Sequence, residues 1–130
     1  MRHNHRLLLP LLGSSLLSAS AALAAPAREV TDLRALWMSA IDSPDGRASG
    51  VFVSPEAKAI ASQMKTTSPL QVQVTTIRTY AQDGCRRLQM TITAENAVVG
   101  PSAGPRNQDL VYAFNYCRDG RPPRSLEVKP

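Results

Sequence analysis

Two segments in the second half of the chain alternate apolar and polar residues with a period of two. In residues 86–94 a large apolar side chain occupies every second position, and Gln or Thr separates these positions. Residues 110–117 alternate large side chains, most of them aromatic, with smaller ones. A period of two, enriched in aromatic and β-branched residues, is typical of half-buried β-strands. We therefore predict two antiparallel neighbouring strands in this region.

One pairing register brings the two patterns into agreement. It sets Cys85 opposite Cys117, the only two cysteines in the chain. It then pairs Leu88 with Phe114, Met90 with Tyr112, and Ile92 with Leu110. All the large apolar side chains fall on one face and both cysteines fall on the other. Because facing Cβ atoms lie at about the separation that a disulfide requires, we predict a structural Cys85–Cys117 bridge.

A third strand is expected over residues 70–80, which are rich in Val, Thr and Ile. Residues 82–84, Gln-Asp-Gly, would form a three-residue hairpin loop. That loop places Val74 opposite Ile92 and puts Tyr80 on the apolar face. Ile77 points the other way, and the pattern does not explain it. We expect residues 70–80, 86–95 and 109–117 to form an antiparallel meander in the order 1-2-3.

Two helices are expected before the sheet. Thr31 is a candidate N-cap for the first helix, whose apolar residues recur at helical spacing from Leu33 to Ile41. Residues 54–56, Ser-Pro-Glu, open the second helix with a cap, a proline at its first position and an acid in its first turn. Residues 51–53 are either a brief edge strand or a packed connection. The predicted fold class is α+β, with both helices packed on one face of the meander and one disulfide on the other.

The first 24 residues resemble a secretory signal peptide. Arg2 and Arg6 precede an apolar run, and Ala22-Leu23-Ala24 supplies a small-residue cleavage motif. The apolar run is short and broken for a membrane span, although an uncleaved anchor is the alternative. We predict a signal peptide over residues 1–24 and one small exported domain over 25–130, periplasmic or secreted, with no membrane span after cleavage. Cleavage would leave 13 basic and 10 acidic side chains, a net charge of only +3.

Composition excludes several kinds of chemistry. Both histidines, His3 and His5, lie in the predicted signal peptide, so the exported domain would contain none. Histidine-based acid–base catalysis, Ser-His-Asp triads and His metal ligands are then excluded. Ser62 and Lys65 match the S-x-x-K motif, but its partner motifs S-D-N and K-T-G are absent. We therefore expect a protein that is not an enzyme, with no metal, cofactor or catalytic residue.

Arginine is the marked charged residue of the predicted sheet. In the hairpin register, several arginines gather at the disulfide end. This group consists of Arg78, Arg86, Arg87, Arg118 and Arg121. Such a cluster can bind an anionic partner, such as an acidic protein patch, a phosphate headgroup or a glycan acid. The mild overall charge does not favour a nucleic-acid partner. The alternative is a solvated sheet end, partly neutralised by Asp83 and Asp119.

The segments "TTIRTYAQDGCRRLQMTIT" and "FNYCRDGRPP", behind a signal peptide and a Trp-bearing helix, resemble small periplasmic accessory proteins encoded beside conjugative-transfer and type IV secretion genes. The resemblance implies a non-catalytic part of a transfer apparatus and carries over no site residues. We expect a periplasmic interaction protein that binds another periplasmic or envelope protein. The alternative is an inhibitor or immunity-type protein that plugs an enzyme with the loop 98–107.

Overall fold

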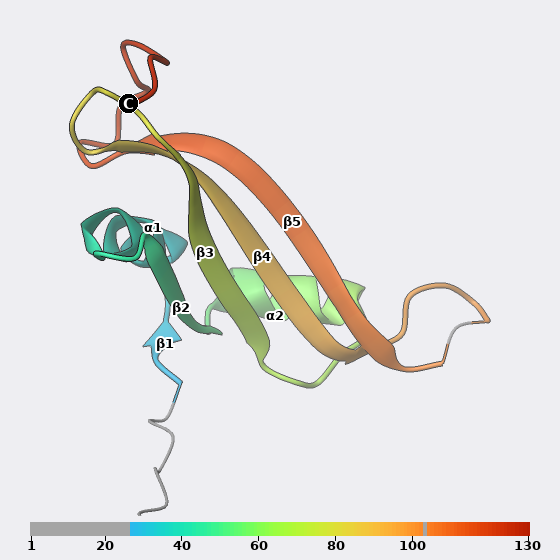
Figure 1. Ribbon diagram of the computed structural model, residues 1–130. Coiled ribbons are helices and arrows are strands. Elements are labelled where there is room, and N and C mark those ends of the chain that lie inside the picture. The colour runs from blue at the N-terminus through green and yellow to red at the C-terminus, as the bar shows by residue number, and fades with distance from the viewer. Residues whose placement is uncertain (1–26, 103) are drawn as a thin grey trace, which may run out of the picture.

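The computed structural model describes residues 27–102 and 104–130, so the predicted signal peptide over 1–24 lies outside the described residues. Within these described residues, two helices and five strands follow one another (Figure 1). They are β1 (Glu29–Val30), α1 (Leu33–Asp42), β2 (Arg47–Phe52), α2 (Pro55–Gln63), β3 (Leu70–Thr79), β4 (Cys85–Ala97) and β5 (Arg106–Cys117).

The five strands form one mixed sheet in the order β1-β2-β3-β4-β5. The predicted three-stranded antiparallel meander is therefore wrong: β1 and β2 extend the sheet beyond β3, and β1 pairs with β2 in parallel. These two strands lack a strong apolar alternation, because β1 has two residues and β2 reads Arg-Ala-Ser-Gly-Val-Phe. Gly50 permits the close approach of β1, since a Cβ there would lie 2.8 Å from the Arg28 carbonyl oxygen.

The register between β4 and β5 is the one that the sequence predicts. Cys85 pairs with Cys117, and the apolar pairs Leu88–Phe114, Met90–Tyr112 and Ile92–Leu110 follow. The two cysteines form a disulfide.

The predicted register between β3 and β4 is wrong by two residues, since Val74 pairs with Met90 and not with Ile92. The hairpin loop is one residue longer than expected, because the Tyr80 N–H donates to the Cys85 carbonyl and closes the loop at residues 81–84. An irregularity between Thr76 and Arg78 then shifts the register once more. Ile77 is the extra residue of this bulge and is 49% exposed, which explains why it departs from the alternation.

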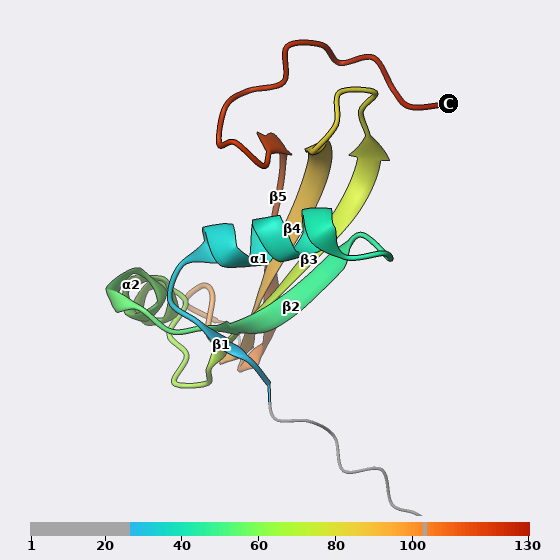
Figure 2. The same cartoon turned by 90° about the vertical axis from the view of Figure 1, so that its left-hand side faces the viewer.

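The main core lies on the face of the sheet that α1 crosses (Figure 2). Every second residue of β4 from Leu88 to Ala94 is buried against it. The Trp37 ring meets Phe114 edge-on, with ring centroids 4.8 Å apart, and its indole N–H lies 3.4 Å from the Met90 sulfur. Ala57 and Met64 add the buried side of α2 to the same cluster. We call this side of the sheet the helix face.

A second, small cluster lies on the opposite face and consists of Tyr80, Cys85 and Cys117. The bulge at Ile77 turns Tyr80 to this face, where its hydroxyl donates to the Asn115 side-chain oxygen at 2.6 Å. The tail after Cys117 crosses the end of the sheet to reach β3 (Figure 2), where Val128 pairs with Tyr80. The tail is held by the Lys129 N–H, which donates to the Thr79 carbonyl at 3.0 Å.

Both helices begin at side-chain caps. The cap of α1 is Asp32 and not Thr31, since its carboxylate accepts from the Arg34 N–H. The Ser54 hydroxyl accepts from the Ala57 N–H at 3.0 Å and caps α2.

We expect Ser54→Ala to lower the free energy of unfolding by about 1 kcal/mol, because the first turn of α2 loses its cap. Urea unfolding followed by far-UV circular dichroism measures the loss. Ser62→Ala, on the exposed side of the last turn, is the matched control and should stay within about 0.5 kcal/mol of wild type. Equal effects of the two variants would contradict the capping role of Ser54.

Candidate functional site

The candidate site is the face of the sheet opposite α1 and α2, which we call the open face. Among the described residues no helix lies over it, and only the tail covers its disulfide end. The strand alternation and the printed register place on this face Arg47, Ser49, Val51, Gln71, Gln73, Thr75, Arg78, Arg87, Gln89, Thr91, Thr93, Asp109, Val111 and Ala113. None of these residues is buried, whereas most of their neighbours on the helix face of β2, β3 and β4 are.

Hydroxyl and amide side chains form rows across the strands of the open face. One row runs from Ser49 through Gln73 and Thr91 to Val111. A parallel row runs from Arg47 through Thr75 and Gln89 to Ala113. Neighbouring strands lie about 4.8 Å apart, so each row presents hydrogen-bonding groups at a regular spacing on a broad surface. Such a surface suits contact with another macromolecule better than enclosure of a small substrate.

Arg78 and Arg87 of the predicted anion-binding group meet on the open face. They are direct register partners on β3 and β4. The Arg87 guanidinium donates to the Asn115 side-chain oxygen at 3.2 Å, and Arg78 is exposed. Two like charges opposite one another repel, so an anion placed between them relieves the repulsion.

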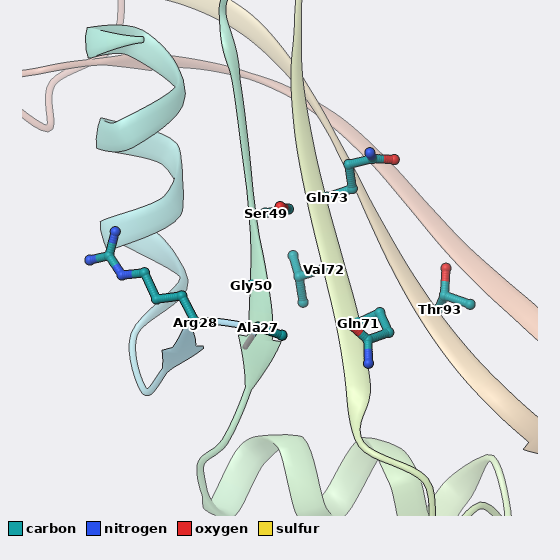
Figure 3. A pocket seen from close by; sticks show the side chains of 8 residues that line it. All are labelled: Ala27, Arg28, Ser49, Gly50, Gln71, Val72, Gln73 and Thr93. Carbon is teal, nitrogen blue, oxygen red and sulfur yellow. The ribbon is translucent and has the colours of Figure 1, made fainter. Parts of the chain in front are cut away.

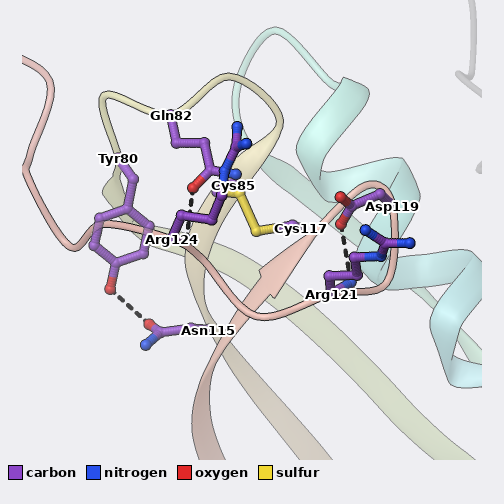
Figure 4. The surroundings of a disulfide bond; sticks show 8 residues. All are labelled: Tyr80, Gln82, Cys85, Asn115, Cys117, Asp119, Arg121 and Arg124. Carbon is purple, nitrogen blue, oxygen red and sulfur yellow. Dashed lines mark hydrogen bonds between the residues drawn. A yellow bond between two sulfur atoms is a disulfide. The ribbon is translucent and has the colours of Figure 1, made fainter.

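The other three predicted arginines lie elsewhere. Arg86 extends over the helix face, where it donates to the Thr79 hydroxyl at 2.9 Å and to the Ile41 carbonyl at 3.4 Å near the end of α1. Arg118 pairs with Asp42 of α1, with its Nη2 2.5 Å from the carboxylate. Arg121 lies in the turn of the tail, where its backbone N–H donates to Asp119 (Figure 4). The structure therefore divides the predicted cluster among three environments.

Asn115 organises the disulfide end of the open face. Its side-chain oxygen accepts from both the Tyr80 hydroxyl and the Arg87 guanidinium. Figure 4 shows Asn115 beneath the Tyr80 ring, on the same side of the sheet as the Cys85–Cys117 bridge. Because the oxygen holds two donors, the amide nitrogen is left to donate to a further group. The alternation of β5 places Asn115 on this face, but the bulge that delivers Tyr80 gives no clear sequence signal.

Arg47 is an open-face residue that the sequence did not single out. It begins β2, and its backbone N–H donates to the Asp45 carboxylate at 3.0 Å. The pKa of Asp45 is lowered from its ordinary value by the Ser43 hydroxyl first and by this backbone N–H second. The pKa of Asp32 is lowered in the same way by its hydrogen bonds to Arg34. Both carboxylates hold turns or caps and lie outside the open face.

A shallow pocket of about 270 Å³ opens at the β1 end of the open face. Its polar lining comes from Ser49, Gln71, Gln73 and Thr93 (Figure 3). Arg28 lies beside the pocket, but its side chain extends toward α1, away from these groups. The pocket therefore offers neutral amides and hydroxyls rather than a charged or nucleophilic group.

Over residues 27–102 and 104–130, no three His, Cys, Asp or Glu side chains gather as a metal site would require. In the same part of the chain no helix is long and apolar enough to cross a membrane. No family model, curated protein or solved structure matches the chain.

Proposed function

We propose that the protein is a non-catalytic, exported interaction protein that holds an acidic protein partner on its open face. The observation that carries this proposal is the uncovered face itself, with its rows of Ser, Thr and Gln and its paired Arg78 and Arg87. A large polar surface with a net positive charge suits recognition of an acidic protein.

Charge on the open face supports an acidic partner. Arg47, Arg78 and Arg87 lie toward the disulfide end. Asp109, an acid on this face, lies at the other end and accepts from the Thr93 hydroxyl at 2.7 Å. An acidic patch would therefore bind in one preferred orientation, with its carboxylates over the arginines and its neutral polar groups over the Gln and Thr rows.

Two features support the proposed location. A disulfide is typical of proteins that work in an oxidising compartment, and the Cys85–Cys117 bridge is present. The predicted signal peptide would deliver the domain to the periplasm or outside the cell. Together with the resemblance of the segments around the hairpin, this supports a role as an accessory of a conjugation or secretion apparatus, bound to a periplasmic or envelope protein.

The double variant Arg78→Glu/Arg87→Glu is expected to weaken binding of the partner at least about tenfold, because like charges would then face each other across the interface. The partner is recovered from periplasmic extract on the immobilised protein, and its affinity is measured by surface plasmon resonance. The matched control is Lys58→Glu, which reverses an exposed charge on α2. Unchanged affinity of the double variant, or an equal loss in the control, would reject the open face as the binding surface.

The inhibitor function is a second candidate, and the loop between β4 and β5 favours it. The described residues of this loop extend beyond the end of the sheet (Figure 1), and Val99 among them is 45% exposed. The predicted plug over 98–107 is shorter in the structure, because Arg106 and Asn107 belong to β5. If an enzyme partner is found, replacing residues 99–104 by two glycines should abolish its inhibition. Inhibition that survives this replacement would exclude the plug.

A further inference from the structure

The β5 strand forms one edge of the sheet, because it pairs with β4 and with no other described strand. In an antiparallel pair, successive residues direct their N–H and C=O groups alternately toward the partner and away from it. The Arg118 N–H donates to the Gly84 carbonyl at 2.9 Å, which fixes the phase of this alternation at the end of β5. Asp109, Val111, Ala113 and Asn115 therefore direct their backbone N–H and C=O groups outward.

This edge lacks the usual protection against pairing with another strand. Natural edge strands are commonly shortened, bulged, or protected by Lys or Pro. Between Gln108 and Cys117, β5 contains neither residue, and its register with β4 is continuous. At its centre Val111 is 58% exposed and Tyr112 is 48% exposed, on opposite faces of the sheet. A further strand along this edge would cover both side chains.

The polar side chains at the two ends of β5 complement each other. Asp109 accepts from the Thr93 hydroxyl through one carboxylate oxygen, and its other oxygen is available as an acceptor. Asn115, six residues along the same face, has its side-chain oxygen held by Tyr80 and Arg87, so its amide nitrogen is available as a donor. When two identical strands pair antiparallel, one end of each strand lies opposite the other end of its partner. The acceptor of each strand can then meet the donor of the other.

We propose that two copies of the protein pair through β5, antiparallel and about a two-fold axis at Tyr112. In this register Asp109 lies opposite Asn115 of the second copy, and Val111 lies opposite Ala113 of the second copy. The outward backbone groups of these residues then form the hydrogen bonds of a continuous ladder. On the helix face, Tyr112 lies opposite Tyr112 of the second copy, and Leu110 lies opposite Phe114.

The strand that pairs with β5 is the β5 strand of a second copy, because both the acceptor and the donor that complement each other lie on β5. Each Asp109 finds its donor on the same strand of the other copy, so a two-fold axis forms both contacts at once. The centre of the interface is also complementary to itself, since the exposed Tyr112 of each copy covers Tyr112 of the other. Pairing would join the two sheets edge to edge and place the two open faces side by side. This dimer is separate from the proposed partner binding and does not depend on it.

Sedimentation equilibrium of the purified exported protein, over a range of concentrations, tests the pairing. Wild type is expected to sediment at twice the mass of the single chain at high concentration. Asn115→Asp should raise the dissociation constant at least about tenfold, because it places two carboxylates opposite each other at both ends of the interface. The substituted carboxylate still accepts from Tyr80 and Arg87, so the fold is retained. Asp109→Asn combined with Asn115→Asp restores a donor opposite an acceptor and should recover the dimer.

A wild-type protein that stays monomeric at every concentration would overturn the proposal. So would a dimer that Asn115→Asp leaves unchanged, or a loss that the exchanged pair does not recover. Tyr112→Cys, which alters none of these polar groups, tests the same axis should a polar variant fail to fold. This variant is expected to form a disulfide-linked dimer under mild oxidation. A Tyr112→Cys variant that stays monomeric would also overturn the pairing.

Discussion

Removing the disulfide by the double variant Cys85→Ala/Cys117→Ala is expected to lower the free energy of unfolding by about 3–4 kcal/mol. The bridge joins residues 32 apart in sequence, and its loss restores the conformational freedom of that loop to the unfolded chain. Both cysteines are 2% exposed and pack with Tyr80 beneath the tail, so truncation also loosens the small cluster. For a domain of this size, such a loss is a large part of the total stability.

Urea unfolding followed by tryptophan fluorescence measures this effect, since Trp37 packs against Phe114 and Tyr116 of β5. Wild type in a thiol reductant is the matched control and should fall to about the stability of the double variant. A double variant as stable as oxidised wild type would contradict a structural role for the bridge.

Leu88→Ala is expected to lower the free energy of unfolding by about 2–5 kcal/mol. Leu88 lies on β4, between β3 and β5, and its side chain faces the core beneath the helices. It is fully buried, with 0% exposure. Truncation removes apolar contacts and leaves a cavity that the surrounding strands fill only in part.

Leu126→Ala is the matched control, because Leu126 lies in the tail and is 60% exposed. Its effect should stay within about 0.5 kcal/mol. Both variants are measured by urea unfolding under oxidising conditions, so that the disulfide is intact in each. Similar losses in the two variants would show that the core is not centred where the structure places it.

The sequence predicts the β4–β5 hairpin well because two independent patterns have to agree. The alternation of each strand fixes its faces, and the two cysteines fix the register between them. A slip by one residue would turn the apolar side chains of one strand to the wrong face. The β3–β4 register had no such second constraint, and a loop one residue longer than expected together with the bulge at Ile77 shifted it by two residues.

For a different reason, β1 was missed and β2 was expected only as one of two alternatives, a brief edge strand over residues 51–53. The two residues of β1 are too short for a periodic signal, and β2 carries Gly50 where a core strand usually has a large apolar residue. The glycine is explained by the Arg28 carbonyl close to it, a contact that becomes visible only when β1 is placed. Long-range pairing of this kind leaves little trace in local sequence.

The arginine cluster was predicted from strand register alone, and register fixes the row of a residue but not the reach of a long side chain. Arg78 and Arg87 do come together, because they are direct partners. Arg86 and Arg118 instead extend to Ile41 and Asp42 at the end of α1, a helix whose position relative to the sheet the sequence did not supply.

The central claim is that the open face is the binding surface. The most direct test is a titration of the isotope-labelled protein with the proposed periplasmic partner, followed through the backbone amide resonances. We predict that the largest shifts fall on open-face residues such as Ser49, Gln73 and Thr91, and that Arg78→Glu/Arg87→Glu abolishes them at the same partner concentration. Shifts confined to α1 and α2, with the resonances of Ser49, Gln73 and Thr91 unmoved, would contradict the account.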